Sequence, residues 1–270
     1  MDDRPIGVFD SGLGGLTTVR ELCRLLPEED IVYFGDTGRV PYGSRSRETI
    51  VKYARQDVAF LRTFDLKTIV IACGTVSTTA LDVLAAENPI PVLGVVAPAA
   101  RAAARATRSG SIGLIGTQAS IRSGAYERLI RAENPAARVL AQPCPLFVPL
   151  VENGRFRPGD VVIETVAAEY LAPLKEAGVD TLVLGCTHYP LLENVIGAYM
   201  GPEVRLINSG AEGARAAADC LRERDALAGP GRGSCRCFVS DRQEDFSRLA
   251  STFLGWDVAQ AVEQVDISQY

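Results

Sequence analysis

Two patterns of hydrophobic and polar positions alternate along the chain. Short runs of β-branched and aliphatic residues are typical of buried strands in a parallel sheet, and longer segments with apolar residues every three or four positions are typical of helices with one apolar face. This alternation predicts βαβ units and parallel sheets. The expected strands lie at 5–9, 30–34, 68–72, 91–96, 111–116, 138–142, 181–185, 203–207 and 236–240. The expected helices lie at 15–26, 46–64, 76–87, 98–107, 121–132, 160–177, 190–199, 211–226 and 241–254.

Three pairs of similar segments occur in the same order in the two halves of the chain. They are 6–11 (IGVFDS) with 112–117 (IGLIGT), 68–73 (TIVIAC) with 181–186 (TLVLGC), and 101–104 with 215–218 (both RAAA). Their nearly constant offset indicates an internal duplication of one α/β unit. We therefore expect two pseudo-symmetric parallel-sheet α/β domains, with the active site in the cleft between them. The expected first domain comprises 1–97 plus 208–270, and the expected second domain comprises 98–207.

Composition narrows the class of protein. A net charge of −5 and a pI near 5.1 argue against binding to nucleic acid or to a membrane surface. No apolar run approaches the ~18 residues of a membrane span, and the acidic start of the chain does not resemble a signal peptide. The seven cysteines form no pattern of a small disulfide-rich domain, so we expect free thiols in a reducing cytoplasm.

Two of these cysteines, Cys73 and Cys186, follow equivalent expected strands. Because the carboxyl ends of strands face the ligand crevice in open α/β sheets, both thiols are expected at one site. Nucleophilic attack by a Cys–His pair is one chemistry open to them, since His188 lies two residues after Cys186. Thiol redox exchange is a second chemistry, but it usually uses a C-x-x-C motif, which this sequence lacks. Only proton abstraction and return by two opposed bases explains why there are two equivalent thiols.

The sequence argues against a bound cofactor or metal. The three lysines, Lys52, Lys67 and Lys175, lie away from the strand ends, whereas a pyridoxal-phosphate enzyme needs a lysine at its cofactor. Zinc bound by Cys73, Cys186 and His188 would lack an evident fourth ligand. The glycine turn at 10–15 departs from a dinucleotide fingerprint at Thr17. At the start of a helix such a turn still suits an anion, including a carboxylate.

Several of these segments together resemble one known family. The matching segments are 9–15 (FDSGLGG), 33–37 (YFGDT), 41–43 (PYG), 72–73 (AC), 144–154 (CPLFVPLVENG) and 185–191 (GCTHYPL). In these segments, which run in family order over nearly the whole chain, the protein resembles the cofactor-independent glutamate racemases of bacteria. The resemblance implies the interconversion of L- and D-glutamate, supplying D-glutamate for peptidoglycan synthesis. It implies no cofactor and a small-molecule substrate. A homodimer is left open, since the sequence does not give the oligomeric state.

The resemblance also implies roles for individual residues. Cys73 and Cys186 would be the two bases, with Asp10 assisting Cys73, and with His188 and Glu152 assisting Cys186. By analogy with the family, Cys73 takes the proton from D-glutamate and Cys186 takes it from L-glutamate. The expected substrate-binding residues are Asp10, Ser11, Pro41, Tyr42, Gly43, Gly74, Thr75, Thr117, Ser120, Thr187 and His188.

One position departs from the family pattern. Gly74 stands where family members usually carry Asn, so the pocket lacks an amide that would contact the substrate. This predicts weaker binding of glutamate, and it predicts that a Gly74→Asn variant lowers KM if the backbone tolerates a side chain. Three alternatives stay open: a racemase for another acidic amino acid such as aspartate, a Cys–His hydrolase using Cys186 and His188, and a non-catalytic binding module.

Overall fold

The computed structural model describes residues 1–256 and 262–270, and its strands form two sheets in which every pairing is parallel. The first sheet has the strand order β10-β9-β2-β1-β3-β4. We call this sheet with its helices the first lobe. Its strands are β1 (Ile6–Asp10), β2 (Ile31–Gly35), β3 (Thr68–Ile71), β4 (Val92–Gly94), β9 (Cys235–Val239) and β10 (Val262–Gln264).

The second sheet repeats the central strand order of the first. It has the order β6-β5-β7-β8, and we call it with its helices the second lobe. The order β8-β7-β5-β6 corresponds strand for strand to β4-β3-β1-β2, as the sequence repeats predict. The structure therefore confirms two parallel-sheet α/β domains, while the exact domain boundaries stay predictions. The strands of the second sheet are β5 (Ser111–Gly116), β6 (Arg138–Pro143), β7 (Thr181–Leu184) and β8 (Arg205–Asn208).

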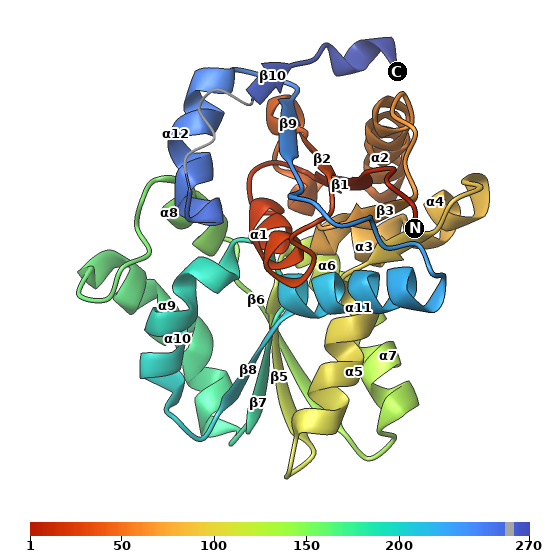
Figure 1. The fold of residues 1–270 in the computed structure, drawn as a ribbon. Coiled ribbons are helices and arrows are strands. Elements are labelled where there is room, and N and C mark those ends of the chain that lie inside the picture. Colours follow the sequence, from red (N-terminus) through yellow and green to blue (C-terminus); the bar gives the residue numbers. More distant parts are fainter. Residues whose placement is uncertain (257–261) are drawn as a thin grey trace.

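Helices cover both sheets (Figure 1). The first sheet lies in the upper half of that view and the second in the lower half, and α11 runs across the region where they meet. The α-helices are α1 (Leu16–Leu25), α2 (Arg47–Leu61), α3 (Gly74–Thr79), α4 (Leu81–Glu87), α5 (Val96–Ala106), α6 (Gln118–Arg122), α7 (Ala125–Glu133), α8 (Phe147–Glu152), α9 (Val161–Glu176), α10 (Glu193–Met200), α11 (Ser209–Glu223) and α12 (Gln243–Leu254). Single 3₁₀ turns are η1 (Thr37–Arg39), η2 (Tyr42–Ser44), η3 (Tyr189–Leu192) and η4 (Ile267–Gln269).

Each expected strand and helix is present, but several boundaries differ. The expected helix at 76–87 is two helices, α3 and α4, which meet at Ala80. The expected helix at 121–132 is also divided, because Gly124 between α6 and α7 has a φ of +62°, a left-handed conformation that glycine adopts without strain. The short elements β10 and α8 were not predicted, since neither is long enough to show a periodic pattern.

One of the buried hydrophobic clusters spans both lobes. Ile6 and Val8 of the first sheet belong to the same buried cluster as Leu182 and Leu184 of the second, and Phe253 of α12 joins them. Each such side chain contributes about 1.5–3 kcal/mol when it is fully buried. This shared packing holds the carboxyl ends of the two sheets against each other.

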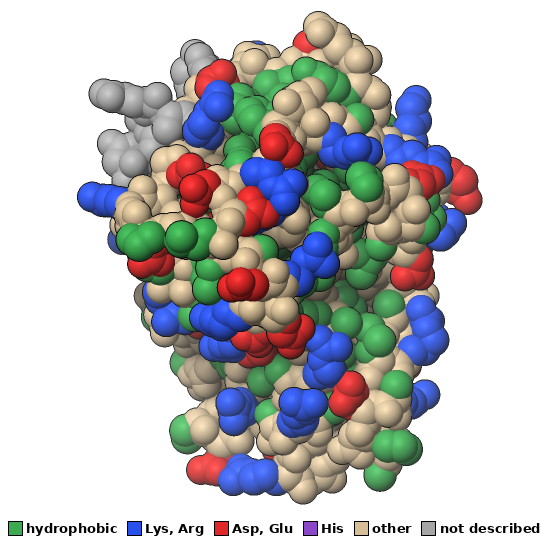
Figure 2. Space-filling view, turned by 45° about the vertical axis from the view of Figure 1, so that its right-hand side comes forward, with side chains coloured by type: hydrophobic (Ala, Val, Ile, Leu, Met, Phe, Trp, Pro, Cys, Tyr) green, Lys and Arg blue, Asp and Glu red, His purple; other side chains and the backbone are tan. Residues whose placement is uncertain are grey.

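Positive and negative side chains are interspersed over the face shown in Figure 2. In the part of the chain that the structure describes, no helix is long and apolar enough to cross a bilayer.

Candidate active site

A cavity of about 360 Å³ lies where the carboxyl ends of the two sheets meet. Cys73 follows β3 and Cys186 follows β7, so the equivalent strands deliver both thiols to this cavity. The residues predicted from the sequence that line it are Ser11, Pro41, Tyr42, Gly43, Cys73, Gly74, Thr75, Thr117, Glu152, Cys186, Thr187 and His188. The two other predicted residues, Asp10 and Ser120, are 1% exposed and lie behind the cavity wall.

One wall of the cavity was missed by reasoning from the sequence. Its members are largely apolar and come from the loop before α8 and from α8 itself, together with a residue before η2: Val40, Cys144, Pro145, Val148 and Pro149. The sequence pointed to this wall only through segment 144–154, which resembles the family. Within that segment a role was predicted for Glu152 alone. An apolar wall excludes water and strengthens electrostatic interactions inside the cavity.

Cys73 has a buried carboxyl group and a hydroxyl group as neighbours. Its thiol is 3.4 Å from the hydroxyl oxygen of Ser11, to which it donates a hydrogen bond. Burial, and then the negative charge of Asp10, raise the pKa of Cys73 to about 12. Cys73 is therefore a thiol at neutral pH, and it is set up to give a proton.

The glycine turn after β1 holds the side chain of Asp10. The backbone N–H of Gly12 donates to Asp10 Oδ2 at 3.0 Å. The binding of a substrate carboxylate at this turn stays a prediction. Gly14, near the end of the turn, packs closely against Thr187. A Cβ atom at Gly14 would lie 2.2 Å from the hydroxyl oxygen of Thr187. Glycine here lets the first lobe approach the segment that carries Cys186.

Cys186 stands at one end of a relay of three side chains. Its sulfur is 3.9 Å from His188 Nδ1, and His188 Nε2 is 3.0 Å from Glu152 Oε1. Burial alone would lower the pKa of His188, but the hydrogen bonds to Cys186 and Glu152 raise it to about 10. An imidazolium in this place stabilises negative charge on the Cys186 sulfur. Phe253 of α12 covers the imidazole ring edge-on, with centroids 5.5 Å apart.

The two lobes touch each other directly around the cavity. The hydroxyl oxygens of Thr75 and Thr117 are 3.0 Å apart, and that of Thr117 is 3.0 Å from the Ser120 hydroxyl. Ser120 therefore acts on the cavity through Thr117.

Gly74 is a further point of contact between the lobes. A Cβ atom at this position would lie 2.5 Å from the carbonyl oxygen of Gly185, the residue before Cys186. An Asn side chain therefore does not fit at position 74 without a backbone shift. This changes the prediction that Gly74→Asn lowers KM, because the variant must first push the two lobes apart.

All seven cysteines are free thiols, as the sequence predicts. Within residues 1–256 and 262–270, no group of three or more His, Cys, Asp or Glu side chains is arranged to hold a metal ion.

Comparison with known proteins agrees with this geometry. Residues 9–217 match the family model for Asp/Glu/Hydantoin racemase. A glutamate racemase of Geobacter metallireducens is 49% identical over 256 residues, which is 94% of this chain and 94% of that protein.

Solved structures give the same result. Glutamate racemase RacE1 of Bacillus anthracis has a TM-score of 0.93 at 38% identity, covering 98% of each chain. A glutamate racemase of Francisella tularensis, in complex with D-glutamate, has a TM-score of 0.92 at 37% identity and covers 100% of both chains. On the match over most of its length and on these identities, the chain belongs to the Asp/Glu/Hydantoin racemase family.

Proposed function

We propose that this protein is a glutamate racemase, which interconverts L- and D-glutamate and so supplies D-glutamate for peptidoglycan synthesis. The observation that carries the proposal is the pair of thiols, Cys73 and Cys186, which reach one cavity from equivalent strands of two similar sheets. A base on one face of the α-carbon and an acid on the other can remove its proton from one side and return a proton from the opposite side, which inverts the stereocentre. Glutamate racemases at 44–50% identity over most of the chain support glutamate as the substrate.

The surroundings of each thiol suggest how the reaction proceeds from L-glutamate. Cys186, as thiolate beside His188, removes the α-proton, and the electron pair of the C–H bond moves onto the α-carbon and its carboxylate. Cys73 then gives its thiol proton to the opposite face, which leaves D-glutamate, a Cys73 thiolate and a Cys186 thiol. The reverse reaction begins from that state, with Cys73 as the base and Asp10 assisting it.

Polar groups around the cavity suit the two carboxylates of the substrate. The hydroxyls of Ser11, Thr75 and Thr187 and the backbone around Tyr42 and Gly43 line the cavity, and we assign them to the α-carboxylate. Hydrogen-bond donors in a cavity with an apolar wall stabilise the negative charge that develops there during proton transfer. We assign Thr117, positioned by Ser120, to the side-chain carboxylate.

The alternative of a Cys–His hydrolase is not favoured, because it leaves Cys73 without a role although this thiol lines the same cavity as Cys186. A cytoplasmic location remains a prediction from the sequence, which leaves a homodimer open.

The test is a turnover assay on protein freed of metal and cofactors by a chelator and by gel filtration. Circular dichroism should show that L-glutamate and D-glutamate each approach the racemic mixture, and that L-aspartate is converted far more slowly. No optical change with either glutamate enantiomer would contradict the proposed function. Loss of activity with the chelator that zinc restores would favour a metal site instead.

A further inference from the structure

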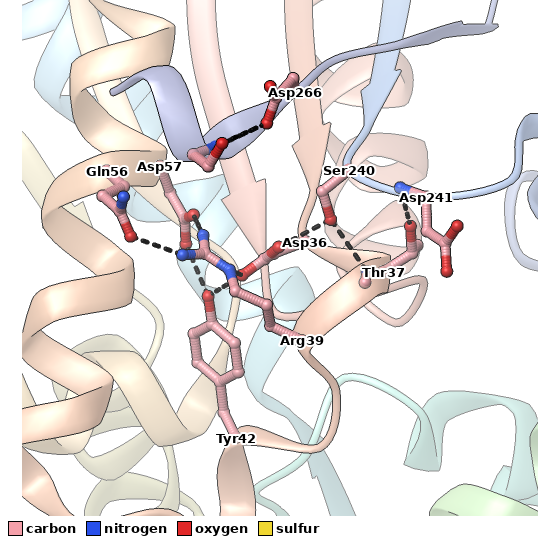
Figure 3. A network of polar contacts seen from close by, with 11 residues as sticks. Asp36, Thr37, Arg39, Tyr42, Gln56, Asp57, Ser240, Asp241 and Asp266 are labelled. Carbon is pink, nitrogen blue, oxygen red and sulfur yellow. Dashed lines mark hydrogen bonds and ion pairs between the residues drawn. The ribbon is translucent and has the colours of Figure 1, made fainter.

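A buried polar cluster lies behind the part of the cavity wall formed by residues 41–43. We call it the Asp36–Asp57 cluster, and Figure 3 shows it. It joins the residue after β2, the turns η1 and η2, helix α2 and the residue after β9. Asp36 and Asp57 are both 0% exposed. The members are Asp36, Arg39, Tyr42, Gln56, Asp57 and Ser240.

Two acids in this cluster share one cation. Arg39 Nε is 2.6 Å from Asp36 Oδ2, and Arg39 Nη2 is 2.9 Å from Asp57 Oδ1. One guanidinium neutralises one carboxylate, so two ionised acids would leave a buried negative charge without a partner, which costs several kcal/mol. A proton on one of the two acids removes that cost.

The phenol of Tyr42 shows which acid carries the proton. Its oxygen is 3.1 Å from Asp57 Oδ2 and in hydrogen-bond contact with Asp36 Oδ2. A phenol has one proton, so it can donate to only one of these oxygens. Asp36 also accepts hydrogen bonds from Arg39 Nε and from the Ser240 hydroxyl at 2.7 Å, so all its partners are donors, as an ionised carboxylate requires. Among the described residues the phenol oxygen is the hydrogen-bond partner of Asp57 Oδ2, so this oxygen is left as the donor.

The electrostatic surroundings of Asp57 agree with this count of protons. Burial, and then the negative charge of Asp36, raise the pKa of Asp57 well above its usual range, and Asp10 acts in the same direction. Arg39 and the hydrogen bond with Tyr42 oppose the shift. Tyr53, on the same helix as Asp57, lies under the Arg39 guanidinium, 4.2 Å from ring centroid to carbon.

We propose that Asp57 carries a proton that it donates to Tyr42, that Tyr42 donates to an ionised Asp36, and that this chain of hydrogen bonds holds residues 41–43 at the substrate cavity. Asp36 and Asp57 are then positioning residues for the racemase, and this part of the inference rests on the proposed function.

The link to the cavity runs through the backbone of η2. The side chain of Tyr42 ends in the cluster, while residues 41–43 line the cavity. On its other side this turn packs against the second lobe, since a Cβ atom at Gly43 would lie 2.9 Å from Thr117 Cβ. Movement of the phenol would therefore displace both the cavity wall and a contact between the lobes.

Two matched Asn variants test the proposal. In Asp57→Asn, the amide oxygen accepts from Arg39 and the amide nitrogen donates to Tyr42, so the variant reproduces a protonated Asp57. We expect its KM and kcat to stay within about twofold of the wild type, because each hydrogen bond of the cluster keeps a donor and an acceptor. In Asp36→Asn, an amide oriented to accept from Ser240 meets the donors of Arg39 and Tyr42 with its own N–H group. Since small displacements at a site cost up to about a hundredfold, we expect KM for glutamate to rise about ten- to a hundredfold and kcat to fall less.

A third variant and an infrared spectrum test the proposal independently of the Asn variants' folding and activity. Tyr42→Phe keeps both acids and the Arg39 ion pair but removes the link, so its KM should rise even if Asp36→Asn does not fold. The infrared difference spectrum between wild type and Asp57→Asn should contain a protonated-carboxyl band that shifts in D₂O. An Asp57→Asn variant as impaired as Asp36→Asn, an unchanged KM in Tyr42→Phe, or the absence of that band would overturn the proposal. The infrared result does not depend on racemase activity, so a failure of the proposed function would show separately.

Discussion

The two thiols occupy equivalent places in two similar lobes, but the groups beside them differ in charge. Cys73 lies near the buried carboxyl of Asp10, which with burial raises the pKa of Cys73 to about 12. Cys186 lies beside His188, whose raised pKa makes it a cation at neutral pH. The duplicated fold therefore repeats the position of the sulfur and not its electrostatic surroundings. The surroundings of Cys73 keep its proton on the sulfur, whereas Cys186 faces a cation that stabilises negative charge on its sulfur.

Replacing the sulfur of Cys73 or Cys186 should have the largest effect on turnover. A serine hydroxyl is a far weaker acid than a thiol, so Cys73→Ser and Cys186→Ser should each lower turnover of both enantiomers by about 10²–10⁴-fold, the usual contribution of an acid–base group. Polarimetry with each enantiomer measures this. Cys220→Ser on α11, a half-buried free cysteine outside the cavity, is the matched control and should keep wild-type activity. A wild-type rate in either of the first two variants would remove one base from the mechanism.

Disturbing the contact between the two half-sites should have the next largest effect. In Gly74→Ala, the new Cβ atom would lie 2.5 Å from the carbonyl oxygen of Gly185, so the segments carrying the sulfurs must separate. We expect kcat/KM to fall about ten- to a hundredfold, as small displacements of reacting groups do elsewhere. Gly231→Ala is the control, because a Cβ atom there meets nothing within 4 Å. If Gly74→Asn instead lowers KM, the backbone yields and the missing amide is restored.

The sequence predicted the sheets and the sulfur positions well, because strand runs and repeats are local signals. The runs ending at Cys73 and Cys186 also indicated the site. What it did not predict depends on distances between remote segments. Three features depend on how the two lobes or several loops lie in space, which the sequence alone does not give. They are the contact of Gly74 with Gly185, the hydrogen bond from the glycine turn to Asp10, and the number of protons around Tyr42. The apolar wall from α8 was missed because that helix is too short to show periodicity.

The charge beside Cys186 should also appear in the dependence of stability on pH. The pKa of His188 is raised to about 10 in the folded protein and is about 6.5 in an unfolded chain. A raised pKa gives a stabilising contribution that is complete below about pH 6.5 and is lost as pH rises through about 10. The difference in free energy of unfolding between wild type and His188→Asn, from urea titrations, should therefore shrink over this range. A difference that stays constant from about pH 6.5 to about pH 10 would mean that His188 is neutral in the folded protein.

The most direct test of unequal half-sites uses α-deuterated L- and D-glutamate with two variants. Because the enantiomers have equal free energies, any variant must lower kcat/KM equally in both directions, so rates alone cannot separate the two bases. Isotope effects can separate them. In His188→Asn, removal of the α-proton by Cys186 should become rate-limiting, and in Asp10→Asn, removal of the α-proton by Cys73 should become rate-limiting. We expect a larger isotope effect on kcat/KM with L-glutamate in His188→Asn and with D-glutamate in Asp10→Asn. Equal isotope effects for the two enantiomers in both variants would contradict the assignment of one base to each face.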